Sequence, residues 1–423
     1  MADHVQPSTI ENQPKSAPNW RELLKPVVIV GALGYFVDIY DLILFSIVRT
    51  ESLMALGYEG ADLLKHGIFL LNAQMIGMLV GGILFGVLGD RKGRVQLLFG
   101  SILLYSLANI ANGFVHNLEL YAVLRFIAGV GLAGELGGCI TLVSEVLSKE
   151  MRGYGTAIVA TVGVLGAVVG GLVADLVNWR YAYFIGGGMG LALLFLRMKV
   201  SESGMFNQLR ENRSTIERGQ FLSLFTDWAR FAKYMRCILI GLPLWFVVGI
   251  LVTFSPEFAK SLEIQGSVTA RYAVMAAYAG LTLGDFLSGF MSQWMRSRKK
   301  VVAGFLAFTT LMIAVYFSAQ GQSASIFYGI IFVMGIGIGY WAVFVTIAAE
   351  QFGTNIRATV ATTVPNFVRG TTVPITMAFT YAKDALGIQV GTIVVAAICI
   401  TIAYAALFWM QETYGKELDY LER

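Results

Sequence analysis

The stretch Gly31-Ala-Leu-Gly-Tyr-Phe-Val-Asp38-Ile-Tyr-Asp41-Leu-Ile-Leu-Phe-Ser46 lies inside an apolar segment, 26–48, that is long enough to cross a bilayer. It nevertheless holds two carboxylates, Asp38 and Asp41. An acid at mid-membrane costs about 2.5–3.5 kcal/mol on an insertion scale, so the pair costs roughly 5–7 kcal/mol. The i, i+3 spacing places both acids on one helix face, which we expect to meet a polar interior. The two interpretations are a proton or ion site in a transport pathway and a structural ion pair between helices.

The composition is that of a membrane protein with many spans. Of the 423 residues, 56% are hydrophobic and only 14% are charged, whereas soluble domains carry about 25% charged residues. The 47 glycines suit close helix packing in lipid. The net charge of +4 does not indicate nucleic-acid binding, because the basic residues gather in particular loops. Three widely spaced cysteines in apolar segments indicate packing residues rather than a metal site: Cys139, Cys237 and Cys399.

Apolar windows of about 20 residues recur along the chain and predict an all-α integral membrane protein with twelve transmembrane helices. The longest polar stretch, 198–234, separates two six-helix bundles. The predicted domains are a tail at 1–25, a bundle at 26–197, the central loop at 198–234, a second bundle at 235–410 and a tail at 411–423. The expected spans are 26–48, 67–88, 96–115, 119–143, 155–177, 181–197, 235–256, 268–294, 301–319, 325–349, 358–381 and 388–410.

The basic residues predict the orientation of these spans. Loop 89–95 and the segment after the eighth span are rich in Lys and Arg, and both lie on the side of the central loop. Opposite loops such as 49–66 are poor in basic residues. Because cytoplasmic loops carry the excess of Lys and Arg, we expect both termini and the central loop in the cytoplasm.

The two halves share a feature at equivalent helix ends. Glu145 and Arg152 lie at the junction of spans four and five, and Glu350 and Arg357 lie at the junction of spans ten and eleven. Each Glu precedes its Arg by seven residues, and the two pairs are 205 residues apart. This match predicts duplicated six-helix halves and makes the four residues candidates for gating.

A basic loop follows the second expected span. Its glycines permit close helix approach, and an acid at a helix end can lock two helices in one state and release them in another. The alternative is an ordinary basic loop. The string resembles the signature of the major facilitator superfamily and departs from it only in the last position, Val95. The resemblance implies a gating role for Gly86, Asp90, Arg91, Gly93 and Arg94.

Span four carries two further charges, Arg125 and Glu135, among spaced glycines. This arrangement resembles the second signature of the same superfamily. By helix rise, Glu135 lies about 12 Å and Asp38 about 18 Å from the cytoplasmic side, so the two acids can share a cavity. Neighbouring buried acids hold protons more readily, which suits proton coupling by Asp38, Asp41 and Glu135.

Ion pairing is the alternative role for each of these charges. Glu135 could pair with Arg125 or with another cation at a helix end, and Arg125 could balance an acid of the first span. We expect Asp38 to be the proton carrier. Asp41 lies nearer Arg125 in depth, and we expect it to be the ion-pair partner.

The second half offers a cation at a similar depth. Arg369 lies about 16 Å into span eleven by helix rise and shares a face with Asn366. A guanidinium group there is a suitable fork for a carboxylate or phosphate, which predicts substrate binding. The alternative is an ion pair with Asp285 or Glu350. Asp285 could equally be a second coupling acid.

Aromatic residues complete the candidate cavity. We expect some of them to line it, although Trp and Tyr in membrane proteins more often pack or anchor at an interface. The candidates are Tyr35, Trp245, Tyr340 and Trp341.

The resemblance covers nearly the whole chain. Gly134-Glu135-Leu-Gly137-Gly138 is similar to strings in the metabolite–proton symporter and sugar-porter branches, and Asp38-Ile-Tyr40-Asp41 to those of phosphate and aromatic-acid symporters. The resemblance implies a multi-pass secondary transporter of the cell membrane that works by alternating access. No nucleotide-binding string occurs, and we expect no enzyme activity, no cofactor beyond the proton gradient and no metal site.

The leading hypothesis is proton-coupled symport of a small polar metabolite, most simply an organic anion, by a monomer in the lipid bilayer. A carrier of a neutral or cationic solute (a sugar, amino acid, nucleoside or metal ion), an exporter, or a receptor without turnover are the alternatives. The sequence leaves open the substrate, the direction of transport, the proton stoichiometry, the obligatory proton carrier and metal binding at the acids.

Overall fold

The computed structural model describes residues 19–92, 94–148, 151–197, 221–353 and 355–416, apart from the side chains of residues 90, 94, 144, 145, 152, 153 and 358. The described chain is helical almost throughout, so the all-α prediction is confirmed. Its elements are η1 (Trp20–Leu24), α1 (Pro26–Ala55), α2 (Ala61–Lys92), α3 (Arg94–Asn112), α4 (Leu118–Leu132), α5 (Glu135–Val146), α6 (Arg152–Leu176), α7 (Trp179–Arg197), η2 (Phe221–Phe225), α9 (Trp228–Leu239), α10 (Leu242–Phe246), the π-helical η3 (Val247–Val252), α11 (Ser255–Ser261), α12 (Ala270–Trp294), α13 (Arg298–Phe317), α14 (Ala324–Gly337), α15 (Trp341–Gln351), α16 (Arg357–Gly370), α17 (Thr372–Leu386) and α18 (Ile388–Phe408).

Ten segments of the described chain are long and apolar enough to cross a membrane. They match ten of the twelve expected spans. The expected spans 181–197 and 358–381 correspond to α7 and to α16 with α17, which lie outside this set. The glycines, aromatic residues and terminal arginines of α7 lower its hydropathy, and α16 and α17 are only 14 and 15 residues long.

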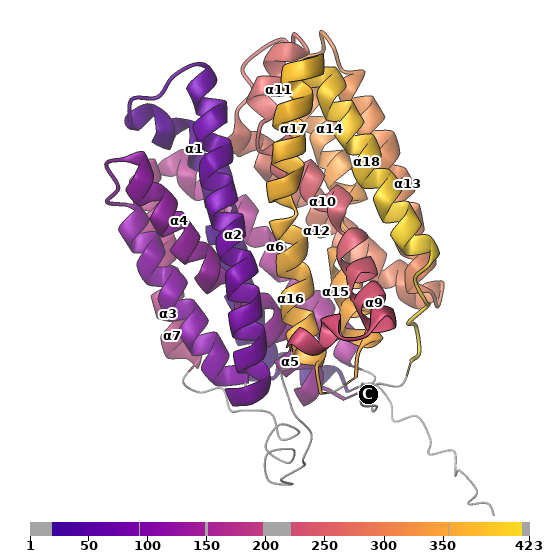
Figure 1. The fold of residues 1–423 in the computed structure, drawn as a ribbon. Coiled ribbons are helices and arrows are strands. Elements are labelled where there is room, and N and C mark those ends of the chain that lie inside the picture. The colour runs from indigo at the N-terminus through magenta and orange to yellow at the C-terminus, as the bar shows by residue number, and fades with distance from the viewer. Residues whose placement is uncertain (1–18, 93, 149–150, 198–220, 354, 417–423) are drawn as a thin grey trace, which may run out of the picture.

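The two halves repeat the same helix pattern. Figure 1 shows the N-terminal helices on one side of the molecule and the C-terminal helices on the other. Equivalent helices begin 205 or 206 residues apart: Leu118 and Ala324 for α4 and α14, Glu135 and Trp341 for α5 and α15, and Arg152 and Arg357 for α6 and α16. The echo in the sequence therefore extends over three consecutive helices. Between the halves, α2 packs on α16 and α6 packs on α12.

Four spans expected to be continuous are broken. The breaks fall at Ala133–Gly134, at Ile240–Gly241 and Thr253–Phe254 in one span, at Ile338–Tyr340 and at Thr371. The span expected to begin at 235 also begins earlier, at Trp228. An unwound or re-started helix exposes backbone donors and acceptors, which is tolerated in a membrane only where protein or a polar cavity receives them. The breaks therefore mark the polar interior of the molecule.

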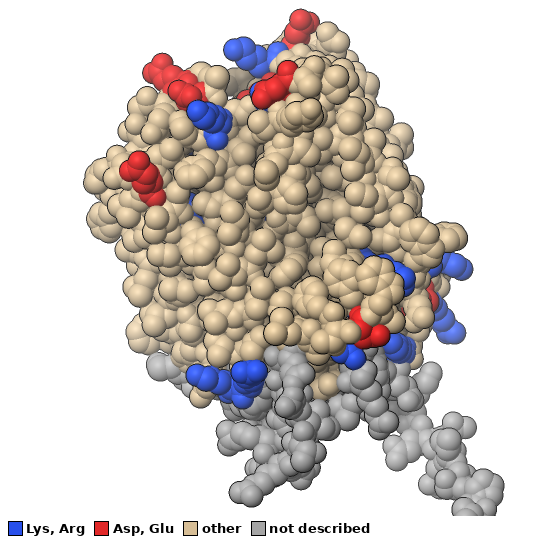
Figure 2. Space-filling view, in the orientation of Figure 1, with Lys and Arg blue, Asp and Glu red and all other residues tan. Residues whose placement is uncertain are grey.

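Charged side chains lie mainly at the two ends of the molecule. Figure 2 shows a broad middle zone that is almost free of them, with Lys and Arg gathered mainly at the lower end. Glu22 accepts a hydrogen bond from the Ser148 amide at 2.9 Å, and Gln351 donates to the Gln411 carbonyl at 3.0 Å. Both described chain ends therefore lie at this same end, which we call the tail end; the opposite end is the far end.

Candidate functional site

The central feature is an ion pair that joins the two halves. Nη2 of Arg369, on the last residues of α16, lies 3.8 Å from Oδ2 of Asp38 on α1, and both side chains are buried. The sequence offered Asp285 or Glu350 as the ion-pair partner of Arg369, and both of these expectations are wrong. The partner is Asp38, which was not considered for this pair. Buried charges of this kind are tolerated only when they are paired.

The guanidinium group of Arg369 has hydrogen-bond donors that the described protein residues do not use. Nη1 donates to Oδ1 of Asn366 at 3.4 Å, while Nε and Nη2 make no hydrogen bond within the described residues. The group lies over the Trp341 ring, 5.5 Å from its centroid. The indole of Trp341 in turn donates to the hydroxyl of Tyr35 at 2.9 Å. Four of the predicted binding residues, Arg369, Asn366, Tyr35 and Trp341, are therefore brought together.

The Asn366 side chain also reaches across to the other half. Its amide donates to the carbonyl of Ala133 at 2.7 Å, in the break between α4 and α5. A side chain added to Gly82 of α2 would collide with Asn366, at 2.9 Å from its Cβ. The break and the glycine together let α16 approach the N-terminal half closely, and the substrate candidates lie at this contact.

Glu135 pairs with a residue that sequence reasoning missed. Its carboxylate binds the guanidinium group of Arg197, at the end of α7, and both are buried. The pair presses against Gly34, where an added Cβ would collide with both side chains. Glu135 therefore follows the interpretation of a pair with a helix-end cation, and the partner is not Arg125. Because Gly34 precedes Asp38 by one helical turn, the pair lies beside the central ion pair.

The expected pair between Asp41 and Arg125 is not formed. Arg125 donates to the side chain of Gln74 and lies over the rings of Phe45 and Tyr183, at 5.2 and 5.8 Å. Asp41 has neither an ion pair nor a standard hydrogen bond among the described residues. Helix depth alone suggested this pair, but Gln74 of α2 lies between α1 and α4 and takes the guanidinium group.

Asp285 accepts a hydrogen bond at the N-terminus of a helix and does not pair with an arginine of the described chain. Its carboxylate accepts from the backbone amide of Ala342 at 3.0 Å, in the first turn of α15. An acid at a helix N-terminus is stabilised by the exposed amides and by the helix dipole. The close approach of Gly284 to Gly339, where an added Cβ would lie 2.4 Å from the Gly284 Cα, holds α12 against this break.

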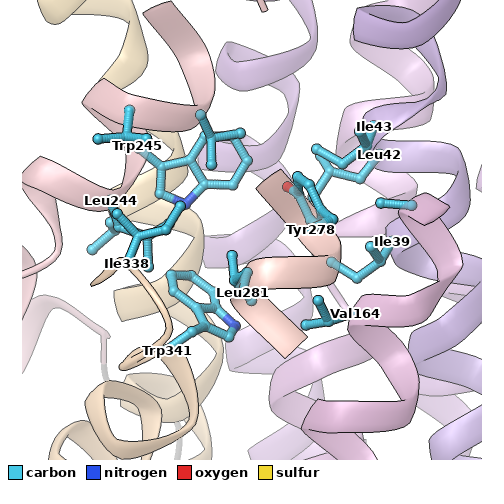
Figure 3. Packing of buried hydrophobic residues seen from close by; sticks show 14 of the residues in the cluster. Ile39, Leu42, Ile43, Val164, Leu244, Trp245, Tyr278, Leu281, Ile338 and Trp341 are labelled. Carbon is cyan, nitrogen blue, oxygen red and sulfur yellow. The ribbon is translucent and has the colours of Figure 1, made fainter. Parts of the chain in front are cut away.

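Aromatic residues close the centre of the molecule. Figure 3 shows Trp245 and Trp341 on one side and the α1 residues Ile39, Leu42 and Ile43 on the other, with Tyr278 and Leu281 of α12 between them. Tyr278 was not predicted. Tyr340 was expected in the cavity, but its hydroxyl donates to the carbonyl of Ile240 at 2.9 Å, within the C-terminal half. Tyr340 therefore satisfies a backbone carbonyl at the break between α9 and α10 and was wrongly expected in the cavity.

The gating candidates lie at the tail end. A Cβ added to Gly86 would lie 3.4 Å from Thr359 on α16, and one added to Gly137 would collide with Thr362. The halves are thus in contact here. Glu350 pairs with Arg298 at 3.3 Å, Arg357 begins α16, and Arg91 is exposed in the last turn of α2. Residue Gly93 and the side chains of Asp90, Arg94, Glu145 and Arg152 lie outside the described residues.

Glu412, in the segment after α18, binds the first turn of α13 at the tail end of the molecule. Glu412 accepts from the amides of Arg298 and Lys299 at 2.9 and 3.2 Å and from the Ser297 hydroxyl. Burial opposes ionisation of Glu412, but these hydrogen bonds outweigh it and hold its pKa below its ordinary value. The carboxylate thereby anchors the helix that carries Arg298, the partner of Glu350.

Direct bonds also join the halves at the far end. The buried guanidinium group of Arg49 lies 2.8 Å from Glu257 and donates to the carbonyl of Thr253 at 3.4 Å. Thr253 itself donates to Ser46 at 3.2 Å. A second group is more exposed, with Arg271 paired to Glu51 and to Asp175. Contacts at both ends and at the centre describe a closed molecule.

Replacing Arg49 by alanine is expected to open the far end. A hydrogen bond to a charged group contributes about 1.5–3 kcal/mol, so the ratio of closed to open molecules falls roughly 10- to 100-fold. The measurement is the rate at which a membrane-impermeant thiol reagent labels a cysteine placed at Ser46, which faces Thr253. Arg271→Ala is the matched control with a small effect, because its partners Glu51 and Asp175 are 49% and 45% exposed. Equal labelling rates in both variants would contradict a role of Arg49 in closure.

Comparison with known proteins agrees with this arrangement. The niacin transporter NiaP of Acinetobacter baylyi is 29% identical over 370 residues, which cover 78% of this chain and 80% of the relative. The cis,cis-muconate transport protein of the same organism is 26% identical, over 81% of this chain and 85% of the relative. A solved structure of a proton:xylose symporter superposes with a TM-score of 0.72 at 15% identity, over 95% of this chain and 98% of the other, and so shares the fold.

The family itself follows from the sequence. The profile of the Major Facilitator Superfamily matches residues 31–370, which include Asp38, Arg369 and the break at Ala133–Gly134. The chain therefore belongs to the major facilitator superfamily, and it is a membrane transporter rather than an enzyme.

Proposed function

We propose that the chain is a proton-coupled symporter of a small organic carboxylate. One observation carries the proposal: Arg369 lies buried between the halves, paired with an acid, and with two guanidinium nitrogens that have no hydrogen bond within the described residues. A guanidinium group binds carboxylates in a bidentate geometry. The names of two relatives, transporters of niacin and of muconate, support the same class, since both compounds are carboxylic acids.

Charge balance supplies the coupling mechanism. Without substrate, the pair of Arg369 and Asp38 is neutral. A carboxylate that binds Arg369 would leave Asp38 as a second, uncompensated anion in a buried site, which costs several kcal/mol. If Asp38 takes up a proton, the site becomes neutral again with one anion and one proton bound. The two are then carried together, and on release Asp38 loses its proton and pairs with Arg369 once more.

Alternating access follows from the two sets of contacts. Opening the far end requires breaking the bonds of Arg49, and opening the tail end requires separating α2 and α5 from α16. Both movements turn one half against the other around the central site. Trp341 and Tyr35, which bond across the halves, would part or shift as the site opens. The aromatic lining suits a planar or unsaturated acid.

The topology proposed for this mechanism has twelve spans, with α7 and the pair α16–α17 included. The tail end, where Lys and Arg gather, faces the cytoplasm. Residues 26–197 and 235–410 are the two bundles, and the protein is a monomer in the cell membrane. These assignments set the direction of the proton gradient that would drive uptake.

Transport by purified protein in proteoliposomes tests the proposal. With an imposed gradient, acidic on the far side, we expect accumulation of labelled nicotinate or muconate, and no accumulation without the gradient. Xylose is the neutral comparison solute and is expected to give none. Exchange of substrate without any gradient would exclude a receptor without turnover. Accumulation of xylose, or uptake of the acids that ignores the pH gradient, would overturn the proposed function.

A further inference from the structure

A second polar site lies inside the N-terminal bundle, away from the interface of the halves. Six buried polar atoms on α1 and α3 have no standard hydrogen bond within the described residues. The side chains that carry them are fully buried. They are both carboxylate oxygens of Asp41, the amide nitrogen and oxygen of Asn109, the hydroxyl of Tyr105 and the hydroxyl of Ser106.

Glycines of α7 bring these groups together. A Cβ added to Gly186 would lie 2.1 Å from Oδ1 of Asp41, and one added to Gly190 would lie 2.0 Å from Oγ of Ser106 and 3.0 Å from the Tyr105 ring. Since Gly186 and Gly190 are one turn apart, Asp41 and Ser106 meet the same face of α7. Asn109 follows Ser106 by three residues on α3, so the two side chains share one face of that helix.

Arg125 adds two more atoms to this group. Its Nε and Nη1 also lack a hydrogen bond within the described residues, and its charge acts on Asp41 without an ion pair. A buried polar atom without a partner is destabilising, and eight of them together would offset much of the stability of an ordinary protein. Something must therefore bond to them in the membrane-embedded protein.

Water fits this group of polar atoms better than a metal cation does. The set mixes acceptors, such as the Asp41 oxygens, with donors, such as the Asn109 amide and the Arg125 guanidinium group. A metal cation would meet the donors and the positive charge of Arg125 as well as the acceptors. Water both donates and accepts, and buried waters characteristically bridge such groups.

We propose that Asp41, Asn109, Ser106 and Tyr105 enclose buried water that relays a proton between Asp41 and the central acids. The two regions adjoin, because Asp38 precedes Asp41 by about one turn on the same face of α1. In each step a carboxyl group gives a proton to a water oxygen, and that water releases another proton to the next acceptor, so no charge is created. The proton can then be held on Asp41 while Asp38 pairs with Arg369.

The relay rests on the proposed proton coupling, and it separates the proton's path from the substrate's. The substrate binds between the halves, whereas the relay lies within one half, between α1, α3 and α7. The charged and titratable groups that face Asp41 are Asp38 and Tyr40 on α1, Tyr105 on α3, Arg125 on α4 and Tyr183 on α7. Of the groups that touch Asp41 and the water, Asn109 and Ser106 do not titrate, so they can be changed without altering the charge.

The test replaces Asn109 by leucine and Ser106 by alanine, singly and together, in the full-length protein. Infrared difference spectra between acidic and alkaline pH, in ordinary and in heavy-oxygen water, detect internal water that changes on titration. We expect such bands in the unaltered protein and their loss in the double variant. Gradient-driven accumulation of labelled nicotinate should fall on the order of tenfold or more, since positioned proton transfer contributes 10²- to 10⁴-fold, while exchange without a gradient persists.

Ser101→Ala is the matched control, because this buried serine on the same helix donates to the Gly131 carbonyl at 2.7 Å and lies outside the group. It should keep both the bands and the accumulation. Absence of the water bands in the unaltered protein, or full accumulation by the double variant, would overturn the relay. If the bands are present but the unaltered protein never accumulates nicotinate, muconate or xylose in response to pH, the proposed function fails and the water site stands.

Discussion

Replacing Arg369 by alanine is expected to weaken the binding of an organic anion by roughly 30- to 5,000-fold, or about 2–5 kcal/mol. The guanidinium group is the central cation between the halves, and its free nitrogens have no other protein partner within the described residues. Removal takes away both the charge and the fork geometry. The measurement is the concentration dependence of nicotinate exchange in proteoliposomes. Arg369→Lys keeps the charge but not the fork, so we expect an intermediate loss.

Thermal stability measurements distinguish a loss of anion affinity in Arg369→Ala from a loss of folding. Arg369→Ala leaves Asp38 buried without its cation, and removal of one partner of a buried pair typically costs about 3–5 kcal/mol. Adding Asp38→Asn removes the orphaned acid, so the double variant should regain most of the lost thermal stability without regaining anion affinity. Arg271→Ala, at the exposed far end, is the control that should change neither quantity. Unchanged nicotinate affinity in a folded Arg369→Ala protein would exclude the anion site.

The sequence predicted the central charges because charge is costly in a membrane. Asp38, Glu135 and Arg369 were singled out by position alone, and all three are buried at the centre. The depth estimates for Asp38 and Arg369 were close enough to make them candidates for one cavity. Periodicity places residues on a helix face, but it does not say which helix that face meets. For this reason the sequence offered Asp285 and Glu350 as partners of Arg369 and missed Asp38.

Arg197 shows a second kind of limit. It ends an apolar span next to a polar loop, where arginines commonly extend to the membrane surface. Nothing in its local sequence distinguishes it from such residues. Its burial depends on Gly34, which belongs to a distant segment and leaves room for the pair with Glu135. Gly34, one turn before Asp38, was the one indication in the sequence. It predicts room for the pair only when the contact between α1 and α7 is known.

The helix breaks depend on tertiary contacts in the same way. The chain at Ile338–Tyr340 contains no proline, and its apolar composition favours a continuous span. The break persists because Asp285 of α12 accepts from the first turn of α15 and Gly284 meets Gly339 closely. From the sequence, Asp285 was a candidate for a second coupling acid. In this structure it has a structural partner, which makes Asp285→Asn a useful control for experiments on the other acids.

Replacing Asp38 by asparagine is expected to abolish accumulation against a gradient and to leave exchange of nicotinate intact. Asparagine has the size of the acid and stays neutral, as the protonated acid does, so Arg369 remains free for the anion. Under the proposed mechanism, anion binding by the unaltered protein requires protonation of Asp38 and should weaken as the pH rises. The variant should bind the anion equally well at acidic and alkaline pH. The measurements are the accumulation ratio and the pH dependence of exchange.

Glu135→Gln should have a different outcome, and the contrast identifies the proton carrier. Loss of the Glu135 carboxylate frees the positive charge of Arg197 beside Asp38, and this charge favours the ionised form of Asp38. Accumulation should therefore fall but stay dependent on pH, with proton uptake moved to more acidic conditions. Asp285→Asn keeps an oxygen acceptor for the α15 amide and should accumulate normally. If Asp38→Asn still accumulates while Glu135→Gln does not, Glu135 is the carrier; if both accumulate fully, neither acid couples the proton, because an amide at the coupling position cannot exchange one.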